Sequence, residues 1–144
     1  MSENKFLNGK KLSFLIIDDE PTVREVISEI LKVNGQLVSQ AVNGNAGIVK
    51  LSKTKIDIIL LDIRMPGMLP PEIIKKVKKI SPKTLIIYLT SVREFNPTEE
   101  DIKKGWVPKI EPPVFGYIEK PISADKLLNN IEKAIKMSKF FKNK

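Results

Sequence analysis

Three short apolar runs constrain the fold of this chain more than any other feature of its sequence. They are LSFLII at 12–17, IDIILL at 56–61 and TLIIYL at 84–89. Each is apolar at almost every successive position, which is typical of strands buried on both faces of a parallel sheet. Two weaker candidates are QLVSQAV at 36–42 and VFGYI at 114–118. The sequence therefore predicts a sheet of five strands.

Helical patterns lie between these runs. After Pro21, apolar residues recur at i, i+3 and i+4 spacing until Gly35, where a helix is expected to end. The same spacing predicts helices over 73–80 and 127–135, whereas 44–53 is weaker because it contains two glycines. Strands that alternate with helices indicate an α/β fold, namely a single doubly wound parallel sheet with helices on both faces.

The length of 144 residues suits one domain. We expect this domain to span 12–138, between a flexible amino-terminal segment at 1–11 and a basic tail at 139–144. There is no signal-peptide pattern, and no apolar stretch approaches the ~20 residues of a membrane span. The chain is therefore expected to be cytoplasmic, without membrane contact, and either a stand-alone domain or a piece of a longer protein.

The composition limits the chemistry that the chain can perform. Without cysteine or histidine it has no disulfide, no thiolate and no imidazole base. Any metal must be bound through oxygen, which favours Mg²⁺, Ca²⁺ or Mn²⁺ over zinc. The net charge of +8 raises the question of nucleic-acid binding. Since the lysines are scattered, without an arginine-rich recognition helix or aromatic stacking motif, we expect a solvated lysine surface and no specific nucleic-acid partner.

Polar residues follow the predicted strands at the ends where ligands bind in such folds. They are Asp18 and Asp19 after the first run, Asp62 after the third candidate strand, Thr90 after the fourth and Lys120 after the last. Two unit charges ~4 Å apart repel by ~4 kcal/mol at an effective dielectric of ~20. Three carboxylates at one edge therefore require a divalent cation, a lysine or both.

A simpler explanation exists for each of these residues alone. Asp18 or Asp19 could cap the helix that begins at Pro21, since acidic groups stabilise the amino-terminal end of a helix. The threonine and the lysine could be ordinary strand-end residues. Helix capping does not explain Asp62, because a Met-Pro-Gly loop follows it at 65–67. The combination therefore favours a functional site.

The chain carries four motifs in order, each at the end of a predicted strand: IIDDE, LLDIRMPGM, IIYLTS and YIEKP. They resemble the motifs of the response-regulator receiver family, the chemotaxis-receiver-like domains of two-component signal transduction, over roughly residues 12–136. The resemblance implies a flavodoxin-like sheet with strand order 2-1-3-4-5. It also implies a phosphoacceptor signalling domain, which is not a conventional enzyme but catalyses its own phosphorylation and slow dephosphorylation.

The resemblance assigns a phosphoacceptor and a metal site. Asp62 would accept a phosphoryl group from the phosphohistidine of a sensor histidine kinase or a phosphotransfer protein. Mg²⁺ would be coordinated by Asp19, Asp62 and the backbone carbonyl of Arg64, with Asp18 acting through water. Phosphoryl transfer to a carboxylate depends mainly on positioning and charge neutralisation, so it requires no histidine in this chain.

The resemblance also assigns a switch. Thr90 would bind a phosphoryl oxygen, and Lys120 would pair with the phosphoryl group. Tyr117 occupies the aromatic switch position of the family and would enter space that Thr90 vacates. The change would reach an unknown downstream protein target, from a monomer or a phosphorylation-dependent dimer.

Two segments depart from the family pattern. The sequence LPP at 69–71 replaces a common Asp-Gly pair and predicts a rigid loop before a helix that begins at Glu72. The segment 91–116 is longer than usual, and its prolines leave room only for a short fourth helix over 98–104. Trp106 in this segment could anchor a partner or fold back over the core. We expect phosphorylation-dependent changes to concentrate there.

Two rival functions fit part of the pattern. A Mg²⁺-dependent phosphatase also gathers aspartates at strand ends. The haloacid-dehalogenase type requires Asp-x-Asp, however, whereas Asp62 is followed by Ile63 and Arg64. The second rival is a degenerate receiver that acts only as a protein-binding module. Against it, this chain has the expected residue at all four motif positions.

Overall fold

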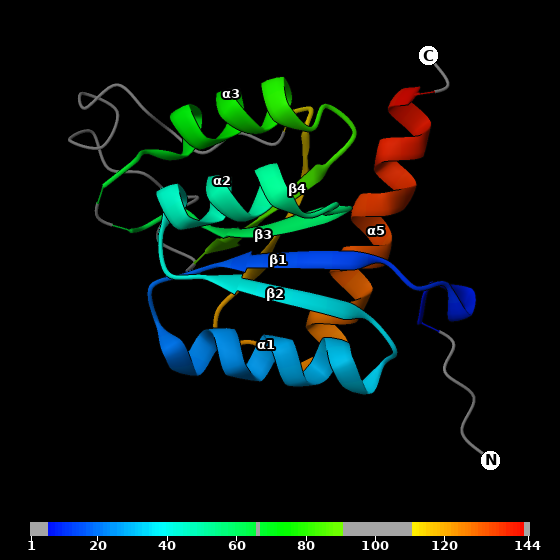
Figure 1. Ribbon diagram of the computed structural model, residues 1–144. Helices are drawn as coiled ribbons and strands as arrows, with labels where there is room; N and C mark the ends of the chain where they lie inside the picture. The colour runs from blue at the N-terminus through cyan, green and yellow to red at the C-terminus, as the bar shows by residue number, and fades with distance from the viewer. Residues whose placement is uncertain (1–5, 66, 91–110, 143–144) are drawn as a thin grey trace, which may run out of the picture.

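The computed structural model describes residues 6–65, 67–90 and 111–142. A five-stranded parallel sheet with strand order β2-β1-β3-β4-β5 forms its centre (Figure 1). The predicted strand order of 2-1-3-4-5 is therefore confirmed. The strands are β1 (Ser13–Ile17), β2 (Leu37–Ala41), β3 (Ile58–Asp62), β4 (Leu85–Thr90) and β5 (Val114–Glu119).

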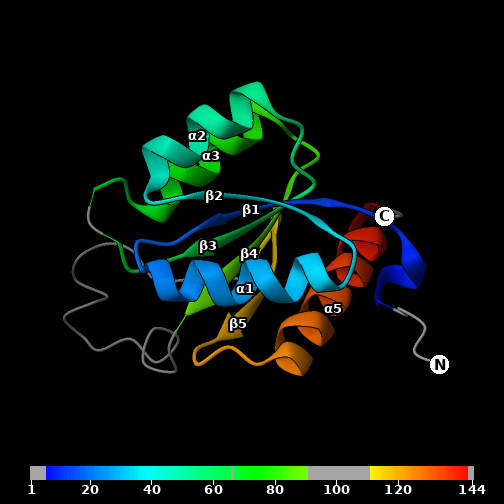
Figure 2. The same cartoon turned by 60° about the horizontal axis from the view of Figure 1, so that its bottom comes forward.

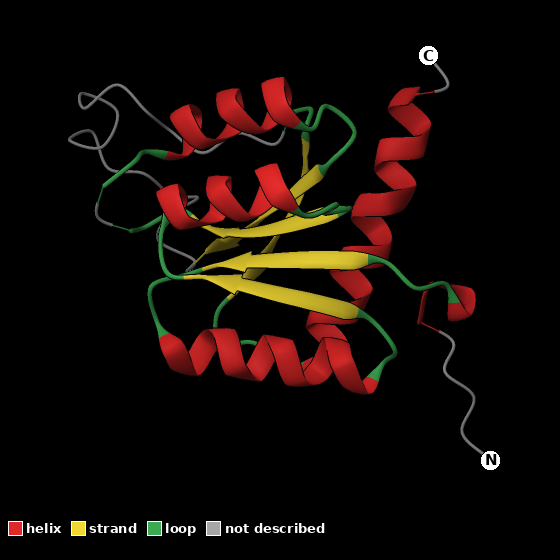
Figure 3. Ribbon diagram, in the orientation of Figure 1, coloured by secondary structure: helices red, strands yellow, loops and turns green. Residues whose placement is uncertain are grey.

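Helices cover both faces of the sheet, as predicted, with α1 and α5 on one face and α2 and α3 on the other (Figure 2; Figure 3). None of the described helices is long and apolar enough to cross a bilayer. The expected short fourth helix and Trp106 fall within 91–110, outside the described residues. The helical elements are η1 (Phe6–Gly9), α1 (Pro21–Val33), α2 (Gly44–Lys53), α3 (Pro70–Ile80) and α5 (Ala124–Lys142).

The apolar runs are explained by burial on both faces of the sheet. In β1, Phe14 and Ile16 pack in the cluster with α1 and α5, whereas Leu15 and Ile17 pack in the cluster with α2 and α3. All four side chains are 0% exposed. Successive side chains of a strand point to opposite faces, so both faces of this strand must be apolar. The edge strand β2 has only one fully buried residue, which agrees with its weaker apolar pattern.

The helix starts differ from two sequence-based expectations. The N-cap residue of α1 is Glu20, and its side chain makes no capping hydrogen bond. Neither Asp18 nor Asp19 is therefore the N-cap residue, although Oδ1 of Asp18 accepts a hydrogen bond from the N–H group of Glu20. In addition, α3 begins at Pro70 rather than Glu72. Proline fits the first helical turn because its missing N–H group needs no partner there, so the expected proline loop is the first turn of a helix.

The two ends of the described chain also differ from the expected boundaries. Part of the amino-terminal segment packs on the domain, because Phe6 is only 5% exposed and lies in the core cluster beside α1 and α5. At the other end, α5 continues past 138 to Lys142. The expected basic tail is thus helical over 139–142.

A glycine permits the close approach of α2 to α3. A Cβ atom on Gly44 would lie 2.8 Å from Cδ1 of Ile73 and 3.3 Å from Cβ of Met68. Ile73 is fully buried and close-packed, so it cannot move aside without disturbing its neighbours. Because Met68 belongs to the loop between β3 and α3, this packing also restrains the segment that follows Asp62.

We expect Gly44→Ala to lower the free energy of unfolding by about 1–3 kcal/mol, because the added methyl group overpacks this contact. Urea denaturation of the variant measures the loss. The m value, which is the slope of the unfolding free energy against urea concentration, should stay unchanged. Gly116→Ala is the matched control, since its Cβ would make an ordinary contact 3.5 Å from Ala134. Equal losses in the two variants would contradict this account of the α2–α3 contact.

Candidate functional site

The carboxyl ends of the strands bring the predicted site residues together. Asp62 is the last residue of β3 and Thr90 the last of β4, while Asp18 and Lys120 directly follow β1 and β5. The Lys120 N–H group donates to the carbonyl oxygen of Thr90 at 2.7 Å, which continues the ladder between these two strands. Asp18 and Thr90 are 0% exposed and Asp62 is 3% exposed. The site is therefore buried at the edge where parallel strands deliver their polar groups.

Lys120 is the cation at the centre of this site. Its ammonium nitrogen lies 3.1 Å from Oδ2 of Asp18, 3.5 Å from Oδ2 of Asp62 and 3.4 Å from Oε1 of Glu20. Burial alone would lower the pKa of Lys120, but the carboxylates of Asp62, Asp18 and Glu20 together raise it above its ordinary value. The lysine is thus firmly charged at neutral pH.

The two buried aspartates are held in the same way. Oδ1 of Asp18 accepts a hydrogen bond from the N–H group of Glu20 at 2.9 Å. Oδ1 of Asp62 accepts one from the N–H group of Arg64, also at 2.9 Å. In each case the donor lies two residues further along the chain. Each carboxylate is therefore fixed by its own loop, while its Oδ2 atom faces Lys120.

One carboxylate oxygen of this pair lacks an aligned donor. Oδ2 of Asp18 is buried without a hydrogen bond of good geometry, although Nζ of Lys120 is 3.1 Å away. That contact is an ion pair without the alignment of a hydrogen bond. A buried oxygen that is charged and poorly satisfied is costly in this state.

The site has the donor set of a hard cation. Oxygen atoms of four carboxylates lie within 4.8 Å of one another, with two residues buried and two exposed. Oxygen ligands of this kind suit Mg²⁺ or Ca²⁺ rather than a softer metal. The buried Oδ2 atom of Asp18 accepts no hydrogen bond, so it can contact such a cation. The residues present therefore fit a divalent cation. They are Asp18, Asp19, Glu20 and Asp62.

Two contributors received no role in the sequence-based site. Glu20 adds a fourth carboxylate, and its position directly after two aspartates, in the motif IIDDE, was the available signal. Arg24 donates from Nη1 to the carbonyl oxygen of Asp18 at 2.8 Å and from Nε to Oε1 of Gln40 at 3.2 Å. It therefore ties the loop after β1 to the edge strand. No local pattern in the sequence reveals this role, because it depends on the pairing of β1 with β2.

The predicted switch residue Tyr117 lies away from the carboxylates. It is on β5, paired with Tyr88 of β4, and its side chain is 39% exposed. It lines an open groove of about 480 Å³ between β5 and α5, together with Phe115 and Met137. Tyr88 is buried instead, and burial together with the charge of Glu111 raises its pKa to about 12.

Sequence comparisons identify relatives of this chain. It matches the family of response regulator receiver domains over residues 14–132. Chemotaxis protein CheY of Listeria monocytogenes is 32% identical over 126 residues, which cover 87% of this chain and 99% of that protein. Sporulation initiation phosphotransferase F of Bacillus subtilis is 28% identical over 119 residues, which cover 83% of this chain and 90% of that protein.

Solved structures show the same architecture. The chemotaxis response regulator CheY4 of Vibrio cholerae is 25% identical, with a TM-score of 0.70 over 87% of this chain and 99% of that one. A CheY-like receiver domain protein from Methanospirillum hungatei is also 25% identical, with a TM-score of 0.71 over 90% of this chain and 98% of that one. Since the family match spans most of the sequence and the fold agrees, the chain belongs to the response regulator receiver domains of two-component systems.

Proposed function

We propose that this receiver domain accepts a phosphoryl group on Asp62 from the phosphohistidine of a sensor histidine kinase or a phosphotransfer protein. The observation that carries the proposal is the pairing of two buried aspartates, Asp18 and Asp62, with one ammonium group, that of Lys120. Such an arrangement has an anionic nucleophile, a cation for the incoming phosphoryl oxygens and oxygen ligands for a metal. A purely structural ion pair would not need the second aspartate.

The metal in this proposal is Mg²⁺. Its ligands would be Asp19, Asp62 and the backbone carbonyl of Arg64, with Asp18 acting directly or through water. Bound there, Mg²⁺ would offset the negative charge of the phosphoryl oxygens and the carboxylates. The poorly satisfied Oδ2 atom of Asp18 supports this assignment. The exposed Glu20 carboxylate lies at the rim of the same cluster.

In the transfer step, a carboxylate oxygen of Asp62 forms a bond to phosphorus as the bond between phosphorus and the histidine nitrogen of the partner breaks. The attacking group is a carboxylate anion, so the step needs no base to remove a proton from a neutral nucleophile. Phosphoryl transfer depends mainly on positioning and charge stabilisation, which explains how a chain without histidine can perform it. Lys120 would exchange its carboxylate contacts for the phosphoryl oxygens.

The signal would then pass to the output face. Thr90 lies at the end of β4, beside the strand that ends in Asp62, and this position supports a role for its hydroxyl in binding a phosphoryl oxygen. Tyr117 is the proposed partner of this movement, and a shift of its side chain, which is 39% exposed, would change the surface of β5. Any coupling to 91–110 lies outside the described residues. The downstream target would be another protein.

Asp62→Asn should abolish phosphorylation, because the amide cannot act as the anionic nucleophile. Intact-mass spectrometry after treatment with acetyl phosphate and Mg²⁺ should show one phosphoryl adduct on the wild-type protein and none on the variant. Asp125→Asn is the matched control, since Asp125 is an exposed carboxylate in the first turn of α5. A full adduct on Asp62→Asn would refute the assignment of the phosphoacceptor.

The Lys120→Ala variant should bind Mg²⁺ with an affinity that is equal to that of the wild type or up to roughly tenfold higher. The reason is that the ammonium group repels a cation in the same cluster. Isothermal titration calorimetry measures the affinity, and circular dichroism shows that the variant is folded. Lys126→Ala is the control, since that lysine contacts the carbonyl oxygen of Pro121 instead of the carboxylates. Weaker binding by a folded Lys120→Ala protein would mean that the lysine supports the metal site.

A further inference from the structure

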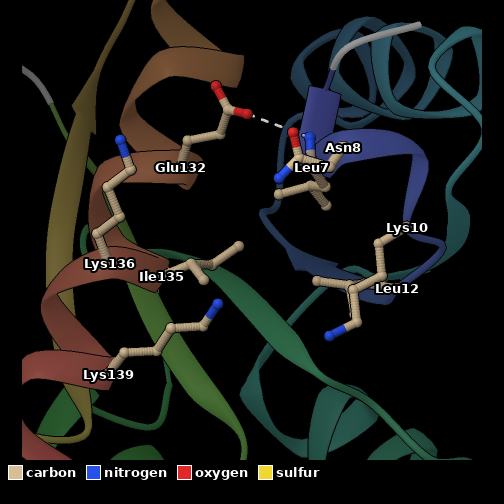
Figure 4. A pocket seen from close by; sticks show the side chains of 8 residues that line it. All are labelled: Leu7, Asn8, Lys10, Leu12, Glu132, Ile135, Lys136 and Lys139. Atoms are coloured by element: carbon tan, nitrogen blue, oxygen red, sulfur yellow. Dashed lines mark hydrogen bonds between the residues drawn. The ribbon is translucent and has the colours of Figure 1, made fainter.

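A second cavity lies between residues 7–12 and α5 (Figure 4). This part of the chain precedes β1 and lies at the amino-terminal ends of the strands (Figure 1), whereas Asp62 is the last residue of β3. Its volume is about 390 Å³. Small-molecule sites typically measure about 300–1,000 Å³, so this cavity is large enough for a ligand. Leu7 and Leu12 form an apolar wall on one side, and Ile135 extends toward them from α5.

The wall formed by the amino-terminal segment is held in an unusual conformation. Leu7 and Asn8 have φ angles of 55° and 54°, in the left-handed region that side chains other than glycine rarely adopt. Phe6 anchors the turn in the core, and the N–H group of Leu7 donates to Oε2 of Glu132 at 3.1 Å. The cavity is therefore built by specific contacts between two distant parts of the chain.

The polar lining of the cavity is basic. Lys10, Lys136 and Lys139 line it, and Glu132 is its one carboxylate, so three positive charges and one negative charge leave a net charge of +2. Among the described residues, no carboxylate lies within ion-pair distance of these three lysines. The Glu132 carboxylate already accepts the hydrogen bond from the turn. The cavity thus combines an apolar wall with unpaired cationic groups at its rim.

The cavity lies almost entirely outside the part of the chain that matches the receiver family. The family match spans residues 14–132. All lining residues except Glu132 fall outside that range, either before 14 or after 132. The side chains contributed by α5 share one face of that helix, because they are spaced by three, four and seven positions.

We propose that this cavity binds a small amphipathic anion, namely a carboxylate joined to a short apolar chain. The apolar chain lies against Leu7, Leu12 and Ile135, and the carboxylate pairs with Lys10 and Lys139 from opposite walls. Binding of this ligand adds a further link between residues 7–12 and α5, beside the hydrogen bond from Leu7 to Glu132. The site is separate from Asp62 and does not depend on phosphorylation.

Sodium octanoate is the probe, titrated into the full chain and followed by proton–nitrogen correlation NMR. We expect saturable shifts of the backbone amides in 6–12 and 132–139, without comparable shifts around Asp62. Octanol lacks the charge and inorganic phosphate lacks the apolar chain. Each is expected to bind at least roughly tenfold more weakly than octanoate.

Charge variants test the basic rim. The double variant Lys10→Met and Lys139→Met keeps the length of both side chains and should weaken octanoate binding by about tenfold. Lys133→Met is the matched control, because Lys133 is an exposed lysine of the same helix that does not line the cavity. It should bind octanoate as the wild type does.

Three results would overturn the proposal. The first is an absence of saturable shifts in 6–12 and 132–139 with octanoate. The second is equal affinity of the double variant and the wild type. The third is phosphate alone causing the same shifts at the same concentration as octanoate, which would leave the apolar wall without a role.

Discussion

Lys120 forms ion pairs with the two buried aspartates, and these pairs hold the candidate site together. Asp18 and Asp62 come from neighbouring strands, so their carboxylates are forced together, and at ~4 Å they would repel by ~4 kcal/mol. Lys120 reaches both, at 3.1 and 3.5 Å. With Asp19 and Glu20 included, however, four carboxylates face one ammonium group, which leaves a net charge of −3. The site therefore favours a divalent cation.

The fold maintains this arrangement because every contributor is attached to a rigid element. Parallel strands end at one edge, and the Oδ1 atoms of Asp18 and Asp62 are held by backbone N–H groups of their own loops. Arg24 links the loop after β1 to the edge strand β2. The close packing of Gly44 against Ile73 restrains the helices on that side. The carboxylates consequently cannot separate to relieve their repulsion without breaking backbone contacts.

Much of this could be predicted from the sequence because the relevant signals are local. Strands buried on both faces produce unbroken apolar runs, and the polar residues that end them belong to the site by topology. The role of Arg24 could not be predicted, since it depends on the distance between α1 and β2. The packing of Phe6 was also missed, because a single aromatic residue in a polar segment has no periodicity. Pro70 was wrongly predicted as a loop residue, because proline is common both in loops and in the first turn of a helix.

We propose that the carboxylate cluster becomes a phosphoacceptor site only when a divalent cation reduces its negative charge. The most direct measurement is the initial rate of labelling by acetyl phosphate as a function of Mg²⁺ concentration, at constant ionic strength. We expect the labelling rate to rise and saturate with Mg²⁺ and to fall to background when a chelator removes the metal. Labelling at an undiminished rate in the presence of the chelator would contradict it.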